Sequence, residues 1–315
     1  MEKILVVDDV FESLLIGLEK HLGAEIHYYP DINPEKIPQK LSEDNYTGLV
    51  IRSKIRISRA LLSHAPILQW IARAGSGIDN IDAEIVEDPN ITVINADGAN
   101  AQSVAEHVLG MILAFQHRLL QSDQHVRSGE WDREAHRGTE IQGKTIGIVG
   151  VGHTGSALAK VLSGFGAHVI GYDKYKLDFE TDYVKKVGFE TLCAQSDIIS
   201  FHVPLSDETH SLIGADFFGR ISRKPLVINA SRGKVMDLNA AITALEKGQI
   251  SGLCLDVLPD EPPLKNDSHH NTKSYRRLFE FEDVMFSPHV AGWSKESYRK
   301  ISDRLLESIL KYKGM

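Results

Sequence analysis

The sequence predicts an α/β protein with two domains, each built on a parallel sheet covered by helices. Short runs rich in Ile, Leu and Val alternate with amphipathic segments along most of the chain, as expected of strands followed by helices. A glycine-rich turn at 150–155 directly follows one of these runs. The chain of 315 residues is also longer than a domain with a single hydrophobic core usually is.

The glycine-rich turn has the spacing of a dinucleotide fingerprint. Gly150 allows a tight turn, Gly152 lets the backbone approach a pyrophosphate, and Gly155 lets helix and strand pack closely. The apolar run Thr145–Val149 precedes it, and Asp173 ends the next apolar run, 23 positions beyond the first glycine. An acid there accepts hydrogen bonds from ribose hydroxyls and repels a 2′-phosphate. The pattern therefore predicts a Rossmann-type doubly wound parallel sheet that binds NAD.

Composition excludes several classes of protein. The net charge of −8 and pI near 6.0 argue against a nucleic-acid-binding surface. No signal peptide precedes Ile4, and no apolar run reaches the roughly 18 residues of a membrane span. Cys193 and Cys254 lack metal-ligand spacing, and adjacent histidines at 269–270 without a third ligand indicate a solvated loop. We expect a cytoplasmic protein without metal, nucleic-acid or membrane partners.

The first 98 residues form a small α/β unit of their own, predicted to be flavodoxin-like. Asp8-Asp9 after its first strand is also seen in phosphate-accepting receiver modules, but a solvated strand end is the favoured interpretation because a second α/β unit follows. Its strands are expected at Lys3–Val7, Glu25–Tyr28, Thr47–Ile51, Leu68–Ala72 and Ile91–Ile94.

Two loops of this unit directly follow strands, where open α/β sheets bind ligands. One carries Arg52 and Ser53, and the other runs from Arg73 through Ser76 and Gly77. Small residues in the second loop leave backbone N–H groups able to cup an anion, to which the arginines add charge-assisted hydrogen bonds.

A long helix is predicted from Ala101 to about Gln124, with apolar residues around much of its circumference, so it should be buried. His107 within it is expected to be packed and hydrogen-bonded. A C-terminal helix from Trp293 to Lys311, capped by Ser294, is expected to return to the first unit. Later strands are expected at His168–Tyr172, Asp197–Phe201, Pro225–Ala230, Ser251–Val257 and Asp283–Ser287.

Three ionisable residues lie where late strands end: Arg232, Glu261 and His289. Strand ends of a parallel sheet face one edge, so we expect the three to meet there. Oxidation of an alcohol needs a base for the hydroxyl proton, and a histidine that titrates near neutrality suits this role. A carboxylate would orient the imidazole and raise its pKa, while an arginine would bind a substrate carboxylate.

Over essentially its whole length the chain resembles the D-2-hydroxyacid dehydrogenase family. The resemblance rests on the fingerprint, Asn229–Gly233, Leu255–Pro262 and Ser287-Pro288-His289. It implies that Arg232, Glu261 and His289 are catalytic and that the enzyme dimerises through the nucleotide domain. It also implies that the backbone at Ser76 and Gly77 holds the substrate carboxylate, and that Asp256 contacts the nicotinamide. The other cofactor-binding residues that we expect are His153, Thr154, His202, Pro204 and Ala230.

Within this family, the substrate segments most resemble those of D-3-phosphoglycerate dehydrogenases. These segments are Arg52-Ser53, Arg73–Asn80, Asn100 and Trp131-Asp132-Arg133. The expected substrate is 3-phospho-D-glycerate or its 2-keto acid, in serine biosynthesis, with Arg52, Arg73 and Arg133 meeting the phosphate charge.

The chain departs from the family pattern at one residue, in one short segment and in its length. His153 replaces an arginine, and Val290–Trp293 differs from the usual run of small residues. The chain ends soon after the last helix, so serine feedback through a C-terminal regulatory domain is not expected. Glyoxylate or hydroxypyruvate reduction is the nearest alternative, and a non-catalytic, NAD-sensing corepressor is a more distant one.

The expected boundaries place an NAD-binding domain at 99–289. The substrate-binding domain would then combine 1–98 with 290–315.

Overall fold

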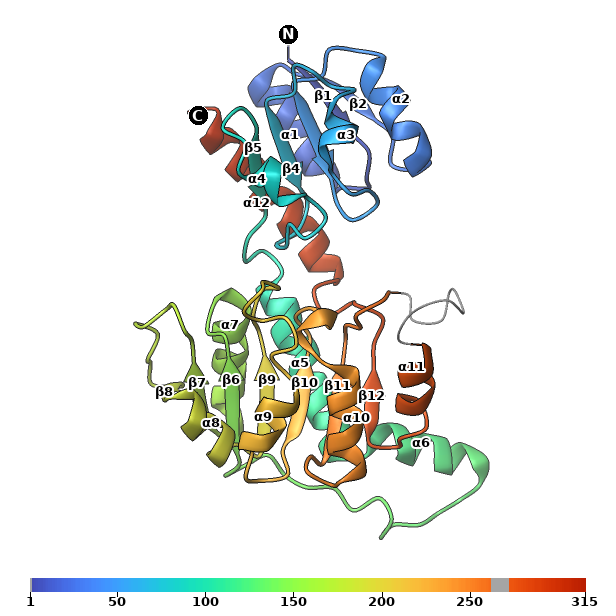
Figure 1. Cartoon of the computed structure of the whole chain (residues 1–315), viewed down its shortest axis with the longest axis vertical. Coiled ribbons are helices and arrows are strands. Elements are labelled where there is room, and N and C mark those ends of the chain that lie inside the picture. The colour runs from blue at the N-terminus through green and yellow to red at the C-terminus, as the bar shows by residue number, and fades with distance from the viewer. Residues whose placement is uncertain (1, 262–271) are drawn as a thin grey trace. The chain divides into compact units, whose positions relative to one another are not determined.

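A computed structural model describes residues 2–261 and 272–315, and the histidines at 269–270 lie outside this range. The chain forms two compact units (Figure 1). Unit 1 comprises the chain up to Asn100 together with Ser294–Met315, and unit 2 comprises Ala101–Trp293. Both junctions lie a few residues beyond the positions expected from sequence.

Unit 1 is built on a five-stranded parallel sheet in the order β2-β1-β3-β4-β5. This is the doubly wound, flavodoxin-like order predicted from the sequence. The strands are β1 (Lys3–Val6), β2 (Glu25–Tyr28), β3 (Gly48–Ile51), β4 (Trp70–Arg73) and β5 (Thr92–Asn95). The helices are α1 (Glu12–Leu22), η1 (Pro34–Lys36), α2 (Ile37–Ser42), α3 (Arg59–Leu62), α4 (Ala83–Val86) and α12 (Lys295–Tyr312).

Helices cover both faces of this sheet, so its strands are apolar on both sides. One core joins the sheet to α1 and α12, and the other joins it to α2, α3 and α4. Helix α12 is held on α1 by polar contacts as well, because Ser13 donates to Asp303 at 2.5 Å and Ser302 accepts from the Phe11 amide at 3.0 Å. Ser294 caps α12 as expected.

Unit 2 is built on a seven-stranded parallel sheet in the order β12-β11-β10-β9-β6-β7-β8. Strand order reverses beside β6, as in the predicted Rossmann-type sheet, and this switch point is where such sheets bind dinucleotides. The strands are β6 (Thr145–Val149), β7 (His168–Tyr172), β8 (Lys185–Lys186), β9 (Ile198–Phe201), β10 (Leu226–Asn229), β11 (Gly252–Leu255) and β12 (Val284–Phe286). The short edge strand β8 was not predicted.

Two cores again lie on opposite faces of the sheet. Helices α5 and α7 bury side chains on one face, and α8, α9, α10 and α11 bury theirs on the other. The helices are α5 (Ala101–Gln116), α6 (Leu119–Ser128), α7 (His153–Leu162), η2 (Ser163–Phe165), α8 (Phe189–Gln195), α9 (Ala215–Arg220), η3 (Gly233–Val235), α10 (Leu238–Glu246) and α11 (Thr272–Leu278).

The single helix predicted from Ala101 to about Gln124 is wrong in its second half. The helix ends at Gln116, and Arg118 adopts a left-handed conformation, φ 51°, before α6 begins. A left-handed residue breaks the ladder of hydrogen bonds, and here neither Gly nor Pro signals the break. Leu119 and Leu120 are consequently exposed, whereas Val108 and Ile112 in α5 are buried as expected.

No helix in the described part of the chain is long and apolar enough to cross a bilayer.

Candidate active site

The fingerprint turn has the geometry that a pyrophosphate requires. Gly150 has φ 90°, and a Cβ there would lie 2.4 Å from the His202 carbonyl oxygen. A Cβ on Gly155 would lie 2.0 Å from the Gly150 oxygen, so helix and strand are in close contact. At Gly152 no atom lies within 4 Å of a Cβ, so this glycine leaves open space beside the backbone. With the N-terminus of α7 directly after it, the turn fits a bound NAD pyrophosphate.

Asp173 ends β7 beside this turn, and its carboxylate is already in use. One oxygen accepts from the Val151 amide at 2.8 Å, and the other accepts from the amides of Tyr175 and Lys176 at 3.0 and 2.8 Å. A carboxylate has about four acceptor positions, so roughly one remains for a ribose hydroxyl. Asp173 therefore anchors the fingerprint turn, a role that the sequence did not indicate, and its expected contact with the ribose stays a prediction.

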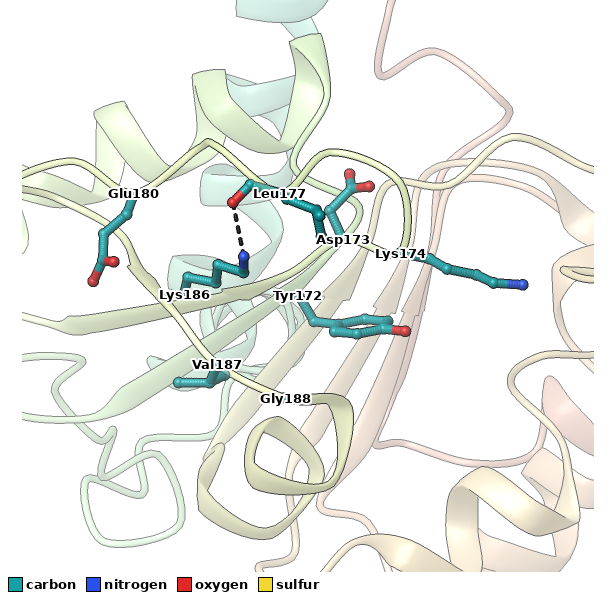
Figure 2. Close-up of a pocket in the computed structure, with 8 residues that line it drawn as sticks. All are labelled: Tyr172, Asp173, Lys174, Leu177, Glu180, Lys186, Val187 and Gly188. Carbon is teal, nitrogen blue, oxygen red and sulfur yellow. Dashed lines mark hydrogen bonds between the residues drawn. The ribbon is translucent and has the colours of Figure 1, made fainter.

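An open hollow of about 440 Å³ lies at the same end of β7 (Figure 2). Asp173 and the Tyr172 ring line it, and the Lys186 amine closes one side by donating to the Leu177 carbonyl at 2.8 Å. The lining of this hollow thus combines aromatic, aliphatic and charged groups next to Asp173, the residue expected to bind the ribose.

The other residues expected to contact the cofactor lie at the same edge of the sheet. His153 and Thr154 begin α7, His202 and Pro204 follow β9, and Ala230 follows β10. Burial lowers the pKa of His202 to about 4, so its imidazole is neutral and adds no charge near the nucleotide.

His289 and Glu261, 28 positions apart in sequence, are hydrogen-bonded. The distance from His289 Nδ1 to Glu261 Oε2 is 2.7 Å, and this bond, together with the charge of the carboxylate, raises the pKa of the imidazole above its usual value. Partial burial and the Arg232 charge oppose the increase. The bond through Nδ1 leaves Nε2 as the nitrogen that can exchange a proton with a substrate.

His289 is held in a left-handed backbone conformation, φ 56°, which is costly for a residue with a Cβ. Asp256, only 2% exposed, supports it: its backbone oxygen accepts from the His289 amide at 2.7 Å. Its carboxylate accepts from the Val290 and Ala291 amides at 2.9 and 2.8 Å. Asp256 therefore fixes the turn that presents the histidine.

Two further residues join this support and were not assigned to it from sequence. Ser287 donates to Asp256 Oδ1 at 2.5 Å, and its hydroxyl lies 2.9 Å from His107 Nε2. His107 is thus the hydrogen-bonded histidine expected from sequence, and it is connected through Ser287 and Asp256 to the turn at His289. Its position in a separate helix, 180 residues away, hid that connection.

Arg232 lies in a loop that is built by its neighbours. The buried Asn229 accepts from the Ser231 amide and hydroxyl and donates to the Arg232 carbonyl at 2.9 Å. A Cβ on Gly233 would lie 2.0 Å from the backbone carbon and oxygen of Leu258. Only glycine allows this contact, which packs the arginine loop onto the loop that carries Glu261. The three expected catalytic residues therefore share one edge of unit 2.

The expected substrate residues of unit 1 also lie together. Ile51 pairs with Arg73 across β3 and β4. Arg73 is the last residue of β4, and Arg52 follows β3 one position further along the register. A Cβ on Gly75 would clash with the Arg73 guanidinium, which shows that the glycine loop folds closely over it. Ser76 donates to Asn100 at 3.0 Å.

Three other residues expected to bind substrate lie in loops or connections. Ser53 is exposed beside Arg52, and Gly77 follows Ser76 in its loop. Arg133 belongs to unit 2, on the exposed connection between α6 and β6.

The fold and the fingerprint define a class of protein, the NAD-binding oxidoreductases with a Rossmann-type domain. Residues 109–291 match the family model described as D-isomer specific 2-hydroxyacid dehydrogenase, NAD binding domain. The chain belongs to the D-2-hydroxyacid dehydrogenase family.

Similar proteins differ in the substrate they are named for. The chain is 32% identical to a D-3-phosphoglycerate dehydrogenase of Archaeoglobus fulgidus over 98% of its own length and 56% of that protein, so it spans little more than half of this relative. It is 34% identical to a glyoxylate reductase of Korarchaeum cryptofilum, over 99% of the chain and 92% of the relative. A D-lactate dehydrogenase from Aquifex aeolicus, solved with NAD and lactic acid, superposes with a TM-score of 0.82 at 25% identity, covering 99% and 95% of the two chains. These similarities show the family of the chain, but they do not show which 2-hydroxyacid is its substrate.

Proposed function

We propose that the protein oxidises 3-phospho-D-glycerate with NAD, or reduces 3-phosphohydroxypyruvate in the reverse direction, as in serine biosynthesis. The observation that carries the proposal is the pair of arginines that leave adjacent strands of unit 1. Arginines at the ends of adjacent strands can each contribute charged hydrogen bonds to a phosphate, which binds arginine in bidentate fashion. The protein has a net charge of −8, so a doubly charged group needs such a local cation pair.

The proposed chemistry centres on His289. In oxidation the neutral imidazole takes the hydroxyl proton at Nε2, while Glu261 stabilises the imidazolium that forms. In reduction the imidazolium returns the proton to the carbonyl oxygen. When bound, NAD supplies the hydride chemistry at its nicotinamide.

Arg232 holds the substrate carboxylate beside the reacting carbon, so that the hydroxyl is directed at His289. The backbone at Ser76 and Gly77 in unit 1 is proposed to contribute N–H groups to substrate binding. Arg52 and Arg73 of unit 1 are proposed to bind the phosphate, and Arg133 of unit 2 is proposed to contribute positive charge to substrate binding.

A second substrate class is favoured by the relatives that this chain covers almost completely. Those relatives include glyoxylate reductases, so an unphosphorylated acid such as glyoxylate or hydroxypyruvate is the alternative. A non-catalytic NAD sensor is the third candidate, and turnover of any 2-oxo acid would exclude it.

The test compares kcat/KM for phosphohydroxypyruvate, hydroxypyruvate, glyoxylate and pyruvate, followed through NADH. We expect at least a roughly tenfold preference for the phosphorylated acid, since a charged hydrogen bond is worth about 1.5–3 kcal/mol. Arg52→Gln should raise KM for this substrate about tenfold and leave KM for hydroxypyruvate nearly unchanged. Arg56→Gln is the matched control, because this side chain is 76% exposed and pairs with Asp82. A wild-type preference for unphosphorylated acids would overturn the substrate assignment.

We also propose a homodimer that forms through unit 2. Apolar side chains are exposed along α6 and the connection after it, at Leu119, Leu120, Val126 and Trp131, with Trp131 at 80%. Such a surface is typical of a subunit interface. Light scattering on the purified protein should give twice the chain mass, and a monomeric mass at micromolar concentration would contradict the proposal.

A further inference from the structure

Two consecutive carboxylates follow β1, next to the loop that carries Arg52. Asp8 is 7% exposed, and one of its oxygens accepts from the Arg52 amide at 2.6 Å. The Lys54 amine lies 3.9 Å from its other oxygen and donates to the Val7 carbonyl at 2.8 Å. Asp8 thus fixes the Arg52 loop, and a nearby lysine balances its charge.

Asp9 has a different environment. It is exposed, and its carboxylate accepts from the Tyr28 hydroxyl at 3.1 Å and from the hydroxyl of Tyr298 in α12. Both partners are neutral, so they hold the carboxylate in place without cancelling its charge. Burial and the bond to Asp9 raise the pKa of both tyrosines, which keeps them protonated as donors.

Arg52 interacts electrostatically with both carboxylates. Burial, the largest effect, lowers the pKa of its guanidinium, while the charges of Asp8 and Asp9 oppose this decrease. An arginine remains charged under such conditions. Because it is partly removed from water, its interactions with neighbouring charges are less screened than those of an exposed side chain.

We propose that Asp9 is a specificity-determining residue that weakens the preference of the Arg52 site for phosphorylated acids. The inference rests on the proposed role of Arg52 in substrate binding. A phosphate carries about −1.5 to −2 charge at neutral pH, whereas the substrate carboxylate is common to both classes of acid. A fixed negative charge beside Arg52 therefore penalises the phosphorylated acid more, and the identity of residue 9 sets the balance between the two.

The test is Asp9→Asn, in which the amide oxygen can still accept from Tyr28 and Tyr298. The quantity measured is the ratio of kcat/KM for phosphohydroxypyruvate to that for hydroxypyruvate, at low and at high salt. We expect this ratio to rise about three- to tenfold at low salt, the effect of removing one charge near a partly buried arginine, and to rise less at high salt. Glu87→Gln is the matched control: it removes an exposed charge just after α4, and the ratio should not change.

An unchanged ratio in a folded Asp9→Asn variant with wild-type thermal stability would overturn the inference. An equal gain with both substrates would also overturn it. These outcomes differ from failure of the proposed function, which the wild-type preference and the Arg52→Gln variant decide in the same assay. If no 2-oxo acid is turned over, calorimetric titration with 3-phosphoglycerate and with glycerate replaces the rates. If Asp9→Asn lowers the Kd for 3-phosphoglycerate but not the Kd for glycerate, the inference is supported. If it does not, the inference is overturned.

Discussion

Replacing Gly233 by alanine should impair catalysis without touching any group that reacts. The added Cβ would lie 2.0 Å from the Leu258 backbone carbon and oxygen and 2.4 Å from the Pro259 nitrogen. An ordinary contact needs about 3.4 Å or more, so one of the two loops must shift by more than about 1 Å. Both are backbone segments, and the shift must therefore displace Arg232 or Glu261.

The cost of this change follows from the geometry. Overpacking of this kind costs about 1–3 kcal/mol of stability. A misplacement of about 1 Å in a catalytic group costs roughly a hundredfold in rate. We expect kcat to fall by about that factor. The Kd for NADH, measured by fluorescence, should change much less, since the fingerprint turn at 150–155 is not part of the displaced loops and Ala230 is the one expected cofactor contact close to Gly233 in sequence.

Gly219→Ala provides the matched control. Gly219 lies in α9, where no atom approaches a Cβ within 4 Å, so the same substitution should be neutral or slightly stabilising there. Wild-type kcat in a stable Gly233→Ala protein would refute the conclusion that this contact positions the catalytic loops.

The remaining predictions concern pH dependence and helix capping. Glu261→Gln replaces the charged partner of His289 by a neutral amide, so the charge-assisted bond that raises the pKa of the imidazole is lost and that pKa falls. The oxidation rate, which increases with pH, and the reduction rate, which decreases with pH, should both show their midpoints at lower pH than in the wild type. We also expect kcat to be reduced about tenfold. Wild-type pH profiles would contradict the role of Glu261 in setting the pKa of His289. Ser294→Ala removes the cap of α12, whose hydroxyl accepts from the Ser297 amide at 3.0 Å. This substitution should cost about 1 kcal/mol of stability, detected as a lower melting temperature than that of Ser63→Ala, a control at an exposed serine that directly follows α3 and caps no helix N-terminus. Equal melting temperatures would show that the cap contributes nothing.

Local patterns in the sequence were sufficient for the architecture. Glycine spacing at Gly150, Gly152 and Gly155, apolar runs of four or five residues, and Asp173 after β7 are all local signals, and the doubly wound sheets follow from them. Family membership also followed from motifs around Arg232, Glu261 and His289. The break at Arg118 was missed because the apolar pattern continues past it and neither Gly nor Pro signals a left-handed residue there.

The sequence by itself determined the fold class, the cofactor and the residues expected to do the chemistry, because each depends on short-range periodicity or on a motif of fixed spacing. Only the tertiary structure decided how these residues are supported. The left-handed turn at His289 depends on Asp256, which lies 33 positions earlier in the chain, and the environment of Arg52 depends on carboxylates from another strand. Such contacts join distant segments whose spacing follows no local rule, since it depends on how the whole sheet is wound.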